Sequence, residues 1–124
     1  MTPPSPYKGK TGLKRIWNAL FYSLDGFKAA LRHEDAFRQE TILAAVMLPL
    51  ALWLGHTGTQ RALLSSSVLL VLVVELLNSG IEAVVDKASP ETSELAKRAK
   101  DMGSAAVLIS LLSALIVWLC VLFR

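Results

Sequence analysis

The sequence is poor in cysteine and in charge for its length. Its 124 residues include one cysteine, Cys120, so no disulfide within the chain can stabilise the fold. Charged residues make up 19% and hydrophobic residues 53%, a composition too apolar for a soluble domain of this size. The first twelve residues lack an apolar core before a cleavage site, so we expect no cleaved secretory signal. Together these absences predict an integral membrane protein.

Motifs that soluble proteins use for metals and nucleotides are also missing. His33 and His56 lie far apart and lack the spacing of a zinc site. Gly9-Lys10-Thr11 resembles the end of a phosphate-binding loop, but Pro4 stands where that loop needs its first glycine. The net charge of +3 comes from basic residues that cluster beside apolar segments. We therefore expect these residues to mark membrane topology, and we expect no nucleic-acid partner.

The segment from residue 13 to residue 31 has the pattern of an amphipathic helix. Apolar side chains recur at intervals of three, four and seven residues, and basic side chains lie elsewhere around the helix. Such a helix suits the interface of a membrane. We expect residues 1–12 to form a flexible N-terminal extension and residues 13–124 to form a single membrane domain.

Three apolar runs follow this helix. A helix needs roughly 20 residues to cross a hydrocarbon core. The first run reaches this length only if its helix begins near Glu34. We predict spans at about 34–55, 62–86 and 104–123. The fold class is therefore an all-α membrane protein with an N-terminal amphipathic interfacial helix and three transmembrane helices.

Local signals refine these spans. Pro49 should kink the first span, and residues 55–59 should form a tight turn. Ser89-Pro90 predicts an N-cap with proline at the first helical position, so that a helix over residues 91–102 runs into the third span.

The distribution of basic residues predicts the orientation. Of the thirteen Lys and Arg residues, seven precede the first apolar run, which begins near residue 41, and four lie between the second and third runs. By the positive-inside rule, the N-terminus and the loop of residues 86–103 are cytoplasmic, and the C-terminus lies on the opposite face. Trp53 and Trp118 fall near that opposite face, as residues of an aromatic belt would.

The second span carries a stripe of polar side chains. At 100° per residue, one helix face holds Glu75, Asn78, Ser79, Glu82 and Asp86. An ionised side chain at the centre of a span costs about 2.5 to 3.5 kcal/mol, so the stripe must be hidden or hydrated. We expect a homo-oligomer in which the stripe faces a neighbouring subunit or a water-filled cleft. The alternative is that the acids pair with Lys or Arg of another helix and only fix assembly.

The depths of the carboxylates favour a division of roles. Glu82 lies near the cytoplasmic boundary, and Glu75 lies about 10 Å deeper. A shallow carboxylate can share Mg²⁺ with nucleotide phosphates. A deeper one can act as a base toward a lipid hydroxyl that stays in the bilayer. Lys100, beyond the boundary, could neutralise phosphate charge. The stripe therefore favours a lipid kinase.

Three strings of residues closely resemble the prokaryotic diacylglycerol kinase family. They are AFRQE at 36–40, VELLNSGIEAVVD at 74–86 and AKRAKDMGSAA at 96–106, within a match over roughly 12–122. The resemblance implies a homotrimer in the bacterial inner membrane with sites shared between adjacent subunits. It also implies transfer of the ATP γ-phosphate to diacylglycerol, giving phosphatidic acid, with Mg²⁺ as cofactor.

The resemblance also assigns roles to individual residues. It implies Glu75 as general base with Asn78 as its polar neighbour, and Glu34 and Glu82 as metal ligands. The residues it places at ATP are Arg15, Tyr22, Glu34, Glu82, Glu91, Lys100 and Asp101. Those it places at the lipid are Ser23, Glu40, Glu75 and Ser104. Gly80 departs from the family, which often has alanine there, and the N-terminal extension has no clear counterpart.

Other functions remain open at this point. An undecaprenol kinase shares the chemistry and differs in lipid, but that branch usually has threonine after the asparagine, where this chain has Ser79. A proton-coupled exporter would want an acid at mid-membrane and commonly four spans. A structural assembly subunit would have no use for Glu34 or for the Lys100-Asp101 pair.

Overall fold

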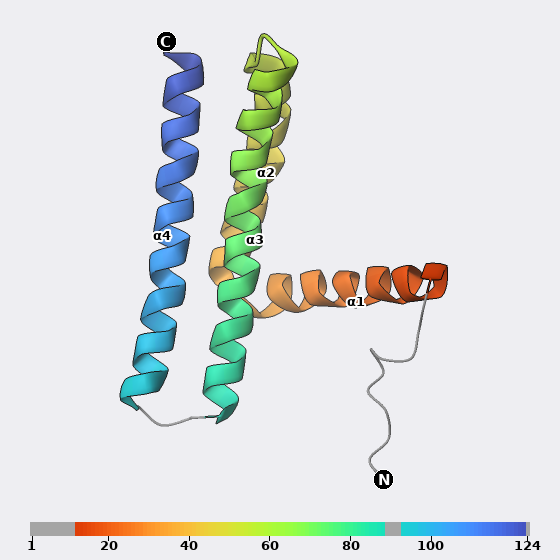
Figure 1. The fold of residues 1–124 in the computed structure, drawn as a ribbon, viewed down its shortest axis with the longest axis vertical. Helices are drawn as coiled ribbons and strands as arrows, with labels where there is room; N and C mark the ends of the chain where they lie inside the picture. The colour runs from red at the N-terminus through yellow and green to blue at the C-terminus, as the bar shows by residue number, and fades with distance from the viewer. Residues whose placement is uncertain (1–11, 89–92, 124) are drawn as a thin grey trace.

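The computed structural model describes residues 12–88 and 93–123, which form four helices. These are α1 (Gly12–His33), α2 (Asp35–Leu54), α3 (Gly58–Ala88) and α4 (Glu94–Leu122). Helices α2, α3 and α4 run alongside one another, and α1 lies crosswise to them (Figure 1). The predicted all-α architecture is confirmed. The expected N-terminal extension lies outside the described residues, apart from Gly12.

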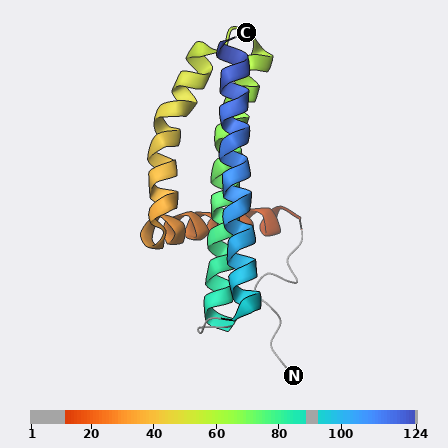
Figure 2. The same cartoon turned by 90° about the vertical axis from the view of Figure 1, so that its left-hand side faces the viewer.

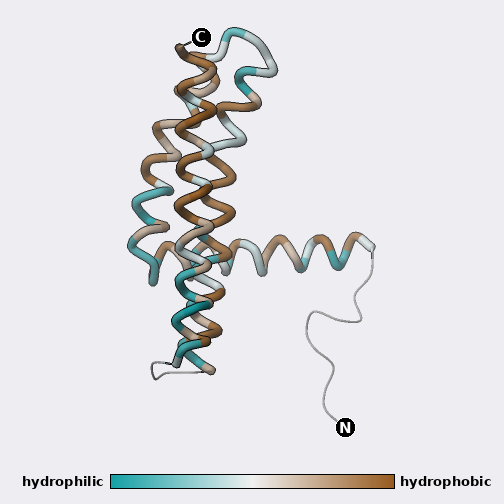
Figure 3. The backbone as a smooth tube through the Cα atoms, turned by 60° about the vertical axis from the view of Figure 1, so that its left-hand side comes forward, coloured by the Kyte–Doolittle hydropathy of each residue, from teal (hydrophilic) through white to brown (hydrophobic). Residues whose placement is uncertain are grey.

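Helices α2, α3 and α4 are each long and apolar enough to cross a membrane. At 1.5 Å per residue, the 31 residues of α3 and the 29 of α4 extend ~46 Å and ~44 Å, more than a hydrocarbon core of about 30 Å. Both helices are hydrophobic toward the α2–α3 turn and become hydrophilic at their other ends (Figure 3). The chain is thus a multi-pass membrane protein, and α3 and α4 continue beyond their apolar sections at the end near α1.

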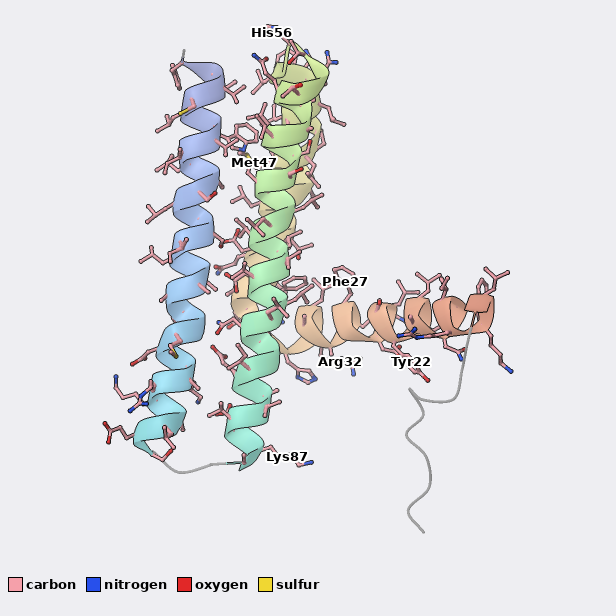
Figure 4. All side chains as sticks on the ribbon, viewed as in Figure 1. Tyr22, Phe27, Arg32, Met47, His56 and Lys87 are labelled. Atoms are coloured by element: carbon pink, nitrogen blue, oxygen red, sulfur yellow. The ribbon has the colours of Figure 1, made fainter. Side chains whose placement is uncertain are left out.

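Helix α1 is amphipathic, as the sequence predicted. Phe27 projects toward the side of the α2–α3 turn, whereas Tyr22 and Arg32 project toward the other side (Figure 4). The apolar face is not covered by the rest of the chain, since Leu13 is 84% and Trp17 61% exposed. This face can therefore contact an apolar environment outside the chain.

A single arginine holds the corner between α1 and α2. The Arg38 guanidinium donates to the carbonyl oxygens of Leu31 and Arg32, at 2.8 and 3.0 Å, and pairs with Asp35. These carbonyls belong to the last turn of α1, which has no partners for them within the helix. Glu34 lies in the corner with extended backbone, and its side chain makes no capping hydrogen bond. The corner therefore fixes the position of Glu34 and leaves its carboxylate uncommitted to the cap.

Helices α2 and α3 are joined by a tight turn, which confirms the prediction for this segment. The amide of His56 donates to the Gln60 side chain at 2.8 Å, and the amide of Gln60 donates to the Thr57 hydroxyl at 3.1 Å. Arg61 closes the end of α2 by donating to the Leu52 carbonyl at 3.0 Å. Helix α2 continues through Pro49 without a break and is curved along its length (Figure 2).

Helix α4 begins later than the sequence predicted. Ser93 is its N-cap and accepts a hydrogen bond from the amide of Ala96 at 3.0 Å. The predicted start at residue 91 is therefore wrong by three residues. Ser89 and Pro90, which motivated that prediction, lie outside the described residues.

Helix α3 packs more extensively against α4 than against α2. Its buried residues include Leu64, Ser67, Val71 and Glu75, at the three- and four-residue spacing of packed helices, and α4 buries Gly103 and Ser110. Such small residues let helix backbones approach closely.

A tryptophan joins the two helices near the α2–α3 turn. The indole of Trp118 donates to the Ser67 hydroxyl at 3.1 Å, and Ser67 donates to the Leu64 carbonyl at 2.8 Å. Trp118, which the sequence predicts as a belt residue, therefore also has a partner on α3. Trp53, by contrast, is 77% exposed.

Candidate active site

The polar stripe on α3 changes from buried to exposed along the helix. Glu75 is 5% exposed, Asn78 and Glu82 are half-buried, and Asp86 is exposed. The gradient follows the predicted order of depth. The chain itself covers Glu75, a role that the sequence analysis had given to a neighbouring subunit or a water-filled cleft.

Carboxylates from three elements lie near enough to Glu75 to act on it electrostatically. Glu40 from α2, Glu82 from α3 and Glu34 from the α1–α2 corner all interact electrostatically with it. A concentration of negative charge in a poorly hydrated place favours a bound cation or proton. The structure thus brings together four of the residues that the sequence analysis selected.

The carboxylate cluster is a candidate site for Mg²⁺. In residues 12–88 and 93–123, no three His, Cys, Asp or Glu side chains form a ready metal site. Mg²⁺ commonly takes one or two carboxylates and completes its shell with phosphate oxygens and water. The hard oxygen donors of Glu34 and Glu82 fit that mode of binding.

Asn78 connects this cluster to α4. Its side-chain nitrogen donates to Glu82 Oε1 at 3.3 Å, while its Oδ1 is buried and has no hydrogen-bond partner. Oδ1 lies only 2.0 Å from the position that a Cβ atom on Gly103 would occupy. The Asn78 amide is therefore lodged between Glu82 and the α4 backbone.

Lys100 and Asp101 face different partners. Lys100 Nζ contacts Asp86 Oδ1 at 2.5 Å, joining α4 to α3, whereas Lys97 Nζ contacts Asp101 Oδ2 at 2.6 Å along α4. Successive side chains on a helix point about 100° apart, which explains the divergence. The alternative that an acid of the stripe pairs with a cation of another helix thus applies to Asp86. Asp101 lines a separate surface groove of about 430 Å³.

A second groove, of about 500 Å³, lies between α1 and α3. Glu34 and Ser79 contribute its polar lining, and Gly26, Ala30 and Gly80 are among its small residues. A Cβ atom on Gly80 would meet nothing within 4 Å, so the departure from alanine at this position is not required by packing within the chain. The groove gives Glu34 access from outside the bundle.

The remaining predicted residues are not gathered at the cluster. Arg15, Tyr22 and Ser23 are exposed on α1, Ser104 is exposed on α4, and Ser23 donates to the Ala19 carbonyl of its own helix at 2.8 Å. Arg15 lies roughly 28 Å from Glu34 along the helix axis, near the end of α1 that is remote from α3 and α4 (Figure 1). Glu91 lies outside the described residues.

Sequence reasoning missed Arg38 and Gly103 as residues that shape the site. The basic side chain of Arg38, just past a helix end, is a recognisable signal for carbonyl capping. Gly103 gave no such signal, because its importance depends on which residue of α3 lies opposite.

Comparisons with known proteins identify the family. The family model described as prokaryotic diacylglycerol kinase matches residues 21–122. A diacylglycerol kinase of Pseudomonas aeruginosa is 53% identical over 119 residues, covering 96% of this chain and 97% of the relative. The diacylglycerol kinase of Escherichia coli strain K12 is 52% identical over 112 residues, covering 90% of this chain and 91% of the relative. The chain therefore belongs to the prokaryotic diacylglycerol kinase family, as the resemblance of its three strings predicted.

Proposed function

We propose that this chain phosphorylates diacylglycerol by direct transfer of the γ-phosphate of ATP, with Glu75 as general base. Diacylglycerol kinase activity follows from membership of the family and from identity of about half to diacylglycerol kinases over nearly the whole chain. The observation that supports the mechanism is the buried Glu75 carboxylate, on which three other carboxylates act electrostatically.

In this mechanism the lipid stays in the bilayer and its hydroxyl reaches Glu75. Glu75 accepts the hydroxyl proton as the lipid oxygen bonds to the γ-phosphorus, and the bond from that phosphorus to the β,γ-bridging oxygen breaks. The products are phosphatidic acid and ADP. Positioned proton transfer of this kind contributes about 10²- to 10⁴-fold to a rate. The burial of Glu75 keeps water away from the base, which limits hydrolysis of ATP.

Two carboxylates are proposed to hold the metal ion. Glu34 and Glu82 would bind Mg²⁺, which neutralises phosphate charge when it is bound with ATP. Asn78 donates to Glu82 and thereby limits the rotamers of that carboxylate. Glu34 is held at a fixed corner by Arg38.

The other predicted contacts complete the proposal. Lys100 would meet the phosphates from α4, and Ser23, Glu40 and Ser104 would surround the lipid headgroup with Glu75. The proposed nucleotide contacts are Arg15, Tyr22, Glu34, Glu82, Glu91, Lys100 and Asp101.

A homotrimer with shared sites is part of the proposal. Arg15 and Glu34 of one chain are too far apart along α1 to serve one compact site, so a neighbouring subunit would supply one of them. Helix α1 would lie in the cytoplasmic interface with its apolar face toward the lipid. The N-terminus and the α3–α4 connection would then be cytoplasmic, and the C-terminus would lie on the opposite face.

The substrate is tested by competition between two lipids. Purified chain in bilayers that contain equal amounts of diacylglycerol and undecaprenol receives radiolabelled ATP and Mg²⁺, and the labelled products are separated. We expect label in phosphatidic acid. Predominant labelling of undecaprenyl phosphate would instead establish the alternative activity, undecaprenol kinase.

A further inference from the structure

Gly103 lies where α4 comes closest to the polar stripe of α3. A Cβ atom at this position would be 2.0 Å from Asn78 Oδ1 and 3.1 Å from Asn78 Cγ. No side-chain atom of any other residue can occupy such a space without displacement. Glycine inside a helix costs about 1 kcal/mol relative to alanine, so this position favours glycine for a reason other than helix stability.

The contact determines how the Asn78 amide is oriented. Oδ1 is buried against the glycine and accepts no hydrogen bond from the described residues. The amide nitrogen on the other side donates to Glu82 Oε1 at 3.3 Å. Rotating the amide by half a turn would place its oxygen against the Glu82 carboxylate, which would be repulsive.

We propose that Gly103 is a positioning residue that seats the Asn78 amide so that its nitrogen faces Glu82. The proposal rests on the role of Glu82 as a ligand for Mg²⁺ with ATP. Gly103 would act only through Asn78 and would touch neither substrate nor metal. A methyl group at 103 would force Asn78 into another rotamer or push α4 away, and either change breaks the donation to Glu82.

The test compares two glycine-to-alanine variants in the full chain, purified and reconstituted in lipid. Gly103→Ala introduces the clash, whereas Gly58→Ala, at the remote end of α3, places the same methyl group where nothing lies within 4 Å. The probe is Mg²⁺ with a non-hydrolysable ATP analogue, and binding is measured from the rise in unfolding temperature as the probe is added. We expect Gly103→Ala to weaken binding about tenfold, the scale of a lost hydrogen bond to a charged group, and Gly58→Ala to bind as the parent does.

A double variant separates positioning from general packing. In Gly103→Ala/Asn78→Ala the amide is gone, so the added methyl group should weaken binding no further than Asn78→Ala alone. If the effects of Gly103→Ala and Asn78→Ala add in the double variant, the proposal is wrong. It is also wrong if Gly103→Ala binds the probe as Gly58→Ala does. If Gly103→Ala does not assemble, assembly of the double variant supports the proposal, and failure of both overturns it.

Glu82→Gln serves as the separate arm for the proposed function. If this variant binds the probe as the parent does, the assignment of Glu82 as a metal ligand is wrong. If it binds weakly while Gly103→Ala binds normally, the metal assignment stands and the positioning role of Gly103 is wrong.

Discussion

The interface between α3 and α4 has two different ends. Near the α2–α3 turn, Ser67 accepts from Trp118 and donates to its own helix. Ser110, in the middle of α4, donates to the Val107 carbonyl at 2.7 Å. These hydroxyls have their partners within the chain. Near α1, Glu75 is buried among carboxylates and Asn78 Oδ1 has no partner.

The polar groups at the two ends of the interface differ in their contribution to stability. A buried polar group without a partner costs roughly 1 to 3 kcal/mol, and like charges near a buried carboxylate add to this. Proteins tolerate such features mainly at functional sites, where a substrate or ion supplies the missing interaction. Ser65 Oγ, two residues from Ser67, is also buried without a partner, so the carboxylates are what distinguish the two ends. The end near Trp118 holds packing contacts, and the end near α1 carries the charged groups that can bind a substrate or ion.

The largest expected effect comes from removing the proposed base. Glu75→Gln keeps the size of the side chain and cannot accept the lipid proton, so kcat should fall about 10²- to 10⁴-fold. The same change removes a charge from a crowded site, so the unfolding temperature should stay level or rise. Phosphatidic acid formation and thermal unfolding in lipid measure the two quantities. Near-normal turnover would remove Glu75 from the mechanism and weaken the contrast between the two ends.

The next effect concerns the metal. Glu82→Gln should raise the KM for Mg-ATP about tenfold and leave the KM for lipid close to that of the parent, because the carboxylate is proposed to act only on the metal. Initial rates at varied Mg-ATP and varied lipid separate the two constants. Glu94→Gln, which removes an acid from the first turn of α4, is the control. A change confined to the KM for lipid would contradict the metal assignment.

Much of the fold followed from sequence patterns. The hydrophobic runs and the amphipathic segment predicted three candidate spans and α1, because these features depend on local composition and periodicity. The stripe on α3 was predicted from helix geometry, and its order of burial matches the predicted depths. Of the acids that act on Glu75, Glu82 was selected from the stripe, and Glu34 and Glu40 received their roles through the family resemblance.

The contacts between helices could not be predicted from the sequence. The partner of Trp118 lies 51 residues away, and the neighbour of Asn78 is a glycine with no side chain to give a signal. Both contacts depend on the rotation and register of α4 against α3, which no local pattern specifies. The pairing of Asp86 with Lys100 has the same origin.

A smaller effect is expected from that ion pair. Asp86→Asn should raise the KM for ATP a few-fold, because Lys100 is no longer held beside α3 at the level of the proposed phosphate site. Stability should change by only about 0 to 1 kcal/mol, since both partners are substantially exposed. Lys87→Gln is the control for a charge change near the end of the same helix. A lower KM would mean that Asp86 competes with phosphate for Lys100, and it would reverse the proposed role of the pair.

The smallest effect on activity should come from the end near the α2–α3 turn. Ser67→Ala removes the acceptor of Trp118 and should lower the free energy of unfolding by about 1 kcal/mol. Because this contact is remote from the carboxylates along α3, kcat and both KM values should match the parent. Denaturant unfolding and steady-state kinetics on the same preparation check both parts. A loss of kcat comparable to that of Glu75→Gln would show that the packing end also controls the chemistry, and the division of the interface into two ends would fail.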